Sequence, residues 1–386
     1  MGRMGRLAAI ANLTLIGLAS TGQAATIQVT TEADVLDGAD GLCSLREAIV
    51  NANDNAATFG SCAAGETAPA VDTIELPAGT YVLAIAGADE DAAATGDLDV
   101  LDHLVIQGAG AADTILDGNQ LDRVLEVHPG ANLDVARVTI RNGRVDGFGG
   151  GMQIRGSGTV TVRDSMVTGN SAASPGSLGL GGGISNNDDG RLTITDTVVT
   201  GNLAESAASF AGGGGVSNNS DGELVVARSR ISGNTARTVT SAASAALGGG
   251  LNNHGSGSQV SIIDSVISGN AAVSSDRPTR GGGLNNNSTG AVTVTGSTIA
   301  GNTSMASTNA ARGGGLANSS VGTLTVLNST ISANAATGLT GDFGGGVDNA
   351  FSGIVELRSS TVVGNSATTG GGIRAAAADS VRLRNT

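Results

Sequence analysis

Aspartate recurs at one position of a sequence repeat, and carboxylates on neighbouring repeats can bind a divalent cation or act as an acid and base pair. Each repeat ends in an Asn, and the position six residues before it holds Asp164, Asp196 and Asp264 in three copies. If the copies stack one strand spacing apart, about 4.8 Å, a sugar could bridge Asp164 and Asp196. These three aspartates are the catalytic candidates if the protein is an enzyme.

A turn would contain the same residue types. The remaining members of this column are Arg228, Gly296, Asn328 and Ser359. Asp, Asn, Gly and Ser are the residues that a turn between two strands prefers, so we favour a turn over a catalytic row.

The other titratable residues give weaker indications of a catalytic or metal site. Asp97, Asp99 and Asp102 form a short acidic group that we interpret as structural. The three histidines lie far apart in the sequence: His103, His128 and His254. The sequence therefore predicts no metal site and no cofactor.

The repeats that must position these side chains are spaced 31 to 36 residues apart. Their terminal residues are Asn170, Asn202, Asn234, Asn270, Asn302, Asn334 and Asn365. Such a period in a chain with 62 Gly among 386 residues is typical of a solenoid.

Three strands are expected in each repeat. The positions ten and eight residues before the terminal Asn are aliphatic in every copy, as on one face of a strand, and the position three residues before it belongs to a second strand. A third strand follows each Gly triplet. Like residues stacked on like residues predict an all-β fold, the parallel β-helix.

Asparagines recur on the inward face of the third strand. They are Asn186, Asn218, Asn253, Asn286, Asn318 and Asn349. An isolated buried amide would cost roughly 1 to 3 kcal/mol, so we predict that these side chains hydrogen-bond one another in a ladder. Segments of four to thirteen residues between each terminal Asn and the next triplet vary in length, and we expect them to be loops along one flank, where binding functions often lie.

The chain begins differently from the repeats. Residues 1–24 combine two Arg with a short apolar stretch and small residues, which predicts a signal peptide and export. Residues 25–75 are the expected cap, 76–145 the first irregular coils and 146–386 the regular repeats. The net charge of -14 argues against nucleic acid or anionic lipid as a partner, and no later segment is apolar for long enough to cross a membrane.

The segment "CSLREAIVNAN" predicts a helix that closes the first end of the solenoid. Ser44 and Glu47 have the spacing of a capping box, and the apolar residues that follow share one helix face. In an exported protein Cys43 and Cys62 are expected to form a disulfide, which would stabilise the fold by roughly 3 kcal/mol.

"CSLREAI", "NAN" and the later "SCAAG" resemble the N-terminal domain of exported bacterial CSLREA-domain proteins. The repeated "GGGI" and "GN" pieces are similar to the β-helix of those proteins and to the repeats of polymorphic outer membrane proteins. The resemblance implies the right-handed pectin-lyase-like fold and a secreted or cell-surface location, without a reaction.

Together these features predict an exported binding scaffold of the adhesion type, with a surface polysaccharide or a protein of a host or neighbouring cell as its partner. The alternative is a polysaccharide lyase or glycoside hydrolase on the same fold. The chain stops partway through a coil, from which we expect either a longer protein or a partner at that end.

Overall fold

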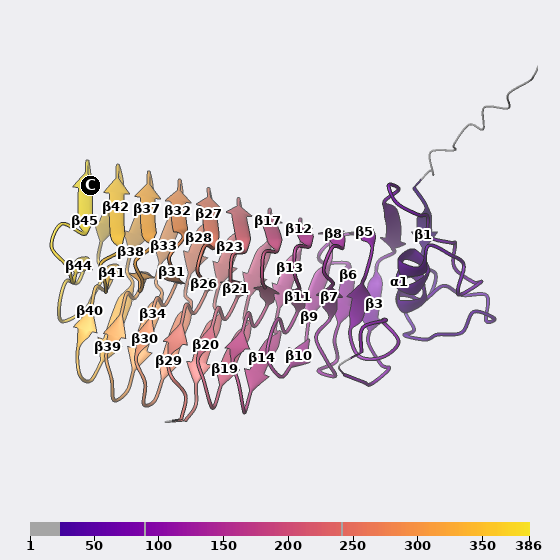
Figure 1. Ribbon diagram of the computed structural model, residues 1–386, viewed down its shortest axis with the longest axis horizontal. Helices are drawn as coiled ribbons and strands as arrows, with labels where there is room; N and C mark the ends of the chain where they lie inside the picture. Colours follow the sequence, from indigo (N-terminus) through magenta and orange to yellow (C-terminus); the bar gives the residue numbers. More distant parts are fainter. Residues whose placement is uncertain (1–23, 89, 241) are drawn as a thin grey trace, which may run out of the picture.

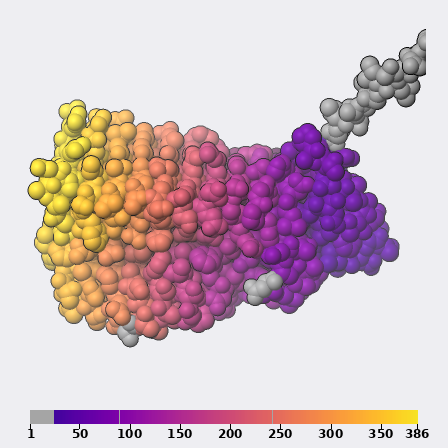
Figure 2. All heavy atoms as spheres, in the orientation of Figure 1, coloured from indigo at the N-terminus to yellow at the C-terminus, as the bar shows by residue number. Residues whose placement is uncertain are grey.

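A computed structural model describes residues 24–88, 90–240 and 242–386. The predicted signal peptide lies outside these residues, except for Ala24. The described chain winds into an elongated parallel β-helix, with the N-terminal cap at one end and the last coil at the other (Figure 1). The coils pack into one continuous body (Figure 2).

Three long sheets form the walls of the helix. Sheet A contains β1 (Thr26–Gln28), β2 (Asp72–Leu76), β5 (His103–Gly108), β8 (Asn132–Ala136), β12 (Thr159–Arg163), β17 (Arg191–Thr195), β22 (Glu223–Ala227), β27 (Gln259–Ile263), β32 (Ala291–Thr295), β37 (Thr323–Leu327), β42 (Ile354–Arg358) and β45 (Val381–Arg384). Sheet B contains β3 (Gly79–Val82), β6 (Thr114–Asp117), β9 (Thr139–Arg141), β13 (Met166–Thr168), β18 (Val198–Thr200), β23 (Arg230–Ser232), β28 (Val266–Ser268), β33 (Thr298–Ala300), β38 (Thr330–Ser332) and β43 (Thr361–Val363). Sheet C contains β4 (Leu98–Val100), β7 (Leu125–Val127), β11 (Met152–Ile154), β16 (Ile184–Asn186), β21 (Val216–Asn219), β26 (Leu251–Gly255), β31 (Leu284–Ser288), β36 (Leu316–Asn318), β41 (Val347–Asn349) and β44 (Ile373–Ala375).

These sheets confirm the predicted fold. Equivalent residues pair in register, as Val160 does with Leu192 and Ile184 with Val216, so aliphatic side chains stack into buried columns. The first Gly of each triplet forms a tight corner before sheet C. At Gly181, φ is +65° and a Cβ would lie 2.3 Å from the carbonyl oxygen of Ile184, so the position accepts no larger residue without strain.

The segments expected to be loops form two further sheets along one side of the molecule (Figure 1). Sheet D contains β10 (Arg144–Val145), β14 (Ser171–Ser174), β19 (Leu203–Ser206), β24 (Thr235–Thr238), β29 (Ala271–Ser274), β34 (Thr303–Ala306) and β39 (Ala335–Gly338). Sheet E contains β15 (Gly179–Leu180), β20 (Ala211–Gly212), β25 (Ala246–Leu247), β30 (Thr279–Arg280), β35 (Ala311–Arg312) and β40 (Asp342–Phe343). The expectation of loops was therefore wrong. Small side chains such as Ala204 and Ala236 stack on one another and are buried, so these segments pair as strands. Within these segments, only the turns between sheets D and E vary in length.

Two asparagine ladders run through the interior. Nδ2 of each predicted ladder residue donates to Oδ1 of the next, at 2.7 to 3.0 Å. The repeat-terminal asparagines form a second ladder, in which Nδ2 donates both to the next Asn and to a backbone carbonyl, as in Asn202. The sequence predicted the first of these ladders and not the second. Both ladders satisfy buried amides by stacking.

Helix α1 (Leu45–Asp54) covers the first end of the β-helix. Ser44 is its N-cap, and both hydrogen bonds of the capping box with Glu47 are present. Cys43 and Cys62 form a disulfide that holds the start of the helix to the following segment. In the described part of the chain, no helix is long and apolar enough to span a membrane.

Candidate functional site

The three catalytic candidates from the sequence lie on an exposed ridge between sheets A and B. Asp164, Asp196 and Asp264 have φ of 50°, 48° and 48°, and the other members of the column also have positive φ, as the turn interpretation expects. Arg228 lies between Asp196 and Asp264, and its Nη2 is 2.7 Å from Asp196 Oδ2. This hydrogen bond lowers the pKa of Asp196. The ridge gives these carboxylates no buried surroundings.

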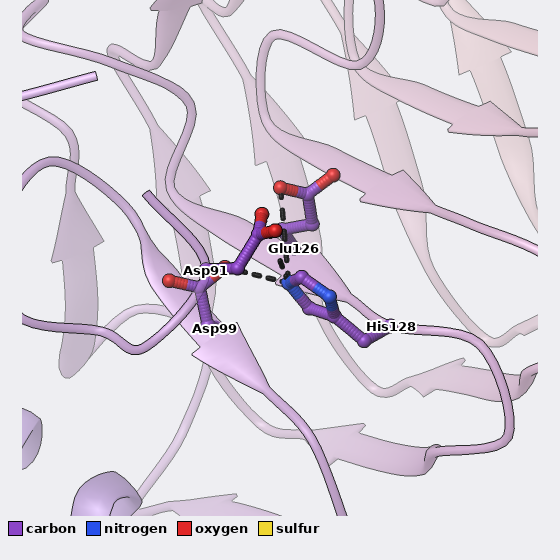
Figure 3. Close-up of side chains that lie close together, drawn as sticks. All are labelled: Asp91, Asp99, Glu126 and His128. Atoms are coloured by element: carbon purple, nitrogen blue, oxygen red, sulfur yellow. Dashed lines mark hydrogen bonds and ion pairs between the residues drawn. The ribbon is translucent and has the colours of Figure 1, made fainter. Parts of the chain in front are cut away.

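A different group of side chains converges at the first coils. Asp99 in β4 and Glu126 in β7 are register partners, and His128 follows β7 directly. His128 Nε2 lies 2.8 Å from Asp99 Oδ1, 3.9 Å from Glu126 Oε2 and 4.0 Å from Asp91 Oδ1 (Figure 3). We call these four residues the His128 cluster. Asp99, Glu126 and His128 are largely buried, whereas Asp91 is exposed.

Two arginines border the His128 cluster. Arg123 Nη1 lies 2.9 Å from both Glu126 Oε2 and Asp97 Oδ2. Arg155 Nη1 lies 3.2 Å from Asp91 Oδ1 and 3.5 Å from Glu126 Oε1. The two guanidinium groups thus partly neutralise the carboxylates.

Burial and hydrogen bonds shift the pKa values of groups in and beside the His128 cluster. Burial raises the pKa of Asp97 to about 7, although Arg123 opposes the shift. Burial likewise raises the pKa of Glu126. The hydrogen bond to Asp99 raises the pKa of His128 against the effect of burial. A carboxyl group that exchanges its proton near neutral pH, as Asp97 does, is suited to acid and base catalysis.

The same four side chains could also hold a metal ion. One ligand atom from each lies within 4.8 Å of all the others. An imidazole with three carboxylates suits a dication such as Zn²⁺ or Mn²⁺. Arg123 and Arg155 compete for Glu126, so a bound cation would have to displace at least one of them from that carboxylate.

A groove of about 370 Å³ lies between sheets C and E, next to the cluster. Phe148, Arg155, Leu180, Asn187, Asn219 and His254 are among the residues that line it. These residues come from four successive coils, those of β11, β16, β21 and β26. Arg155 lines the groove and also contacts Glu126, so this side chain lies between the groove and the His128 cluster. We call it the sheet C groove.

The sequence did not indicate that the residues of the His128 cluster lie close together. From Gln153 onward, Gly triplets mark the register of the outward column of sheet C. The structure extends it back to Glu126 and Asp99, two coils that lack the triplet, at intervals of 27 residues. Counting back from Gln153 by that interval would have found both carboxylates, but Asp91 lies in a loop that no repeat predicts.

The comparisons with known proteins bear only on the fold of the chain. No family model and no curated protein matches the chain, so the resemblance to CSLREA-domain proteins stays a prediction. Pectate lyase Pel9A is similar with 15% identity and a TM-score of 0.44, over 81% of this chain and 74% of that protein. The A-module of the Azotobacter vinelandii mannuronan C-5 epimerase AlgE6 is similar with 16% identity and a TM-score of 0.36, over 90% and 96% of the two chains.

Proposed function

We propose that the protein is an exported β-helix that binds an extended polysaccharide in the sheet C groove. The observation that carries this proposal is that polar and aromatic side chains from four successive coils line one continuous groove. Coils repeat about every 4.8 Å along the axis, so the groove offers polar groups at regular intervals. A polymer of repeating units has the matching regularity.

The groove has the chemistry that sugars require. Asn187 and Asn219 provide amides, which both donate to and accept from hydroxyl groups. Asn219 Nδ2 donates to Asn187 Oδ1 at 2.8 Å, so the two amides are already oriented before a ligand binds. Phe148 and His254 line the groove and add ring surface for sugars, and Phe210 supports His254, with ring centroids 5.2 Å apart.

Export is part of the proposal. The predicted signal peptide supports it, and so does the disulfide between Cys43 and Cys62, because such bonds persist in oxidising compartments. A secreted or surface-attached scaffold would meet polysaccharides of its own cell envelope or of neighbouring cells.

A second candidate function is cleavage of the bound polysaccharide. It is favoured by Arg155, which joins the groove to Glu126, and by the raised pKa of Glu126. In this case Glu126 would act as the general acid, and His128, held by Asp99, would be its partner in proton transfer.

A retention screen tests the proposal. The purified protein is passed over immobilised neutral and acidic polysaccharides, with and without calcium, and reducing ends and unsaturated products are recorded. We expect retention that falls about tenfold in the double variant Asn187→Ala and His254→Ala, which corresponds to a loss of about 1.4 kcal/mol. Asp196→Asn on the ridge is the matched control and should be retained like the unaltered protein.

The outcomes separate the two functions. Retention without products supports binding alone, and products that disappear in Glu126→Gln while retention persists support cleavage. Retention that depends on Asp196 and not on the groove would contradict both.

A further inference from the structure

Three arginines gather around one aspartate in the C-terminal coils. Arg280 in β30 and Arg312 in β35 are neighbours in sheet E, and Arg374 in β44 pairs with Asp348 in sheet C. Arg374 Nη1 lies 2.9 Å from Asp348 Oδ1, and Arg312 Nη1 lies 3.7 Å from Asp348 Oδ2. A chain of net charge -14 thus carries a local excess of positive charge here.

Arg280 is the least well paired of the three arginines. Asp348 attracts it, but within residues 24–88, 90–240 and 242–386 its guanidinium forms no close ion pair, and its buried Nε has no hydrogen-bond partner. The guanidinium also lies 5.9 Å from the ring centroid of Phe351. A partly desolvated cation that one shared carboxylate compensates only from a distance is costly, and a bound anion would reduce that cost.

Neighbouring groups are arranged as a receptor for an anion. Phe343 contacts two of the arginines, with Arg312 Cζ 4.8 Å and Arg374 Cζ 4.3 Å from its centroid, and this stacking restricts both guanidinium groups. The side chains of Arg312 and Arg374 are 25% and 20% exposed, so a small ligand can reach them.

We propose that Arg280, Arg312 and Arg374 form a binding site for an oxyanion: a carboxylate, sulfate or phosphate group. Guanidinium groups bind such groups with paired, charge-assisted hydrogen bonds. The site lies along the same sheet as the sheet C groove, since Leu180, Gly212, Leu247 and Arg280 are in register in sheet E. It does not depend on the proposed polysaccharide function, because a free anion satisfies the same donors.

Titration calorimetry at constant ionic strength tests the site. Sodium sulfate, phosphate and acetate are titrated into the full chain, and we expect saturable binding that weakens about tenfold or more in Arg280→Gln. Arg191→Gln is the matched control, because Arg191 is exposed and paired with Glu223 on another sheet, and it should leave the affinity unchanged. Asp348→Asn should instead tighten binding several-fold, because it removes the internal competitor for two guanidinium groups.

Two sugars identify the source of the anion. Glucuronate that binds where glucose does not would assign the site to acidic sugars, whereas binding of inorganic sulfate alone would assign it to a free anion. Absence of saturable binding by every probe would overturn the proposal. Equal weakening by Arg280→Gln and Arg191→Gln would do the same, since it would indicate general charge screening.

Discussion

Residues near His128 show how burial in this fold changes the pKa of a single side chain. Asp97 is buried beside Arg123, and burial outweighs the guanidinium and raises its pKa to about 7. The folded protein therefore binds a proton on Asp97 more tightly than the unfolded chain does. Stability from this residue is present at low pH and decreases as the pH rises from about 3.8 to about 7.

Asp97→Asn tests this linkage. The amide cannot lose a proton, so the variant should gain stability relative to the unaltered protein as the pH rises from 4 to 7, by on the order of 3 kcal/mol. Urea unfolding at each pH measures the difference in free energy of unfolding. Asp196→Asn is the control, because Arg228 lowers the pKa of Asp196 and the relative change should have the opposite sign. A difference for Asp97→Asn that stays constant with pH would contradict the account.

For individual residues, the sequence predicted the ridge and missed the His128 cluster, because only the ridge residues follow the repeat alignment. The aspartates of the ridge stand at fixed distances from repeat-terminal asparagines, so alignment finds them and their residue types predict a turn. Glu126 and Asp99 belong to coils with a shorter period and no Gly triplet. The loop of Asp91 and Ala93 completes the cluster, with Ala93 N donating to Asp99 Oδ2 at 2.7 Å, and it has no periodic pattern.

Helix α1 connects the cap to that loop through Arg46. The side chain is fully buried, with Nε 2.6 Å from Asp34 Oδ1. Its Nη1 donates to the carbonyl oxygens of Ala93 and Asp97, and its Nη2 donates to that of Gly96. The cap thereby fixes the loop that completes the His128 cluster, so its role extends beyond covering the end of the solenoid.

Arg46→Met should destabilise the protein by about 3 to 5 kcal/mol, because it leaves Asp34 and three carbonyl oxygens buried without their donor. Urea unfolding gives the loss, and amide exchange should increase at residues 93–97. Arg191→Met on the exposed surface should change stability by less than about 0.5 kcal/mol. A loss for Arg46→Met as small as that of the control would refute the anchoring role.

Sheets D and E were not predictable as strands from their residues alone. Segments such as 171–174 are short and contain only Ser and Ala, which have little strand preference and resemble loops. They become strands because each packs on the equivalent segment of the next coil, a tertiary effect that single-segment patterns do not contain. The sheet C groove depends on sheet E, so the groove could not be predicted from the sequence either.

The β-helix as a whole was predictable because its order is one-dimensional. Each coil contacts mainly its neighbours, so the period, the aliphatic columns and the inward asparagines specify the stack directly. The same regularity makes the groove a linear site: its lining residues span four coils, or three steps of about 4.8 Å, roughly 14 Å in all. The central claim is that this length is occupied by one extended polysaccharide.

The most direct test measures affinity against chain length. Oligosaccharides of increasing length, prepared from a retained polysaccharide, are titrated into the protein by calorimetry. The account predicts that affinity rises with each added sugar until the chain spans roughly 14 Å and then levels off. A monosaccharide that binds as tightly as the longest chain, or affinity unaffected by Asn187→Ala and His254→Ala, would contradict it.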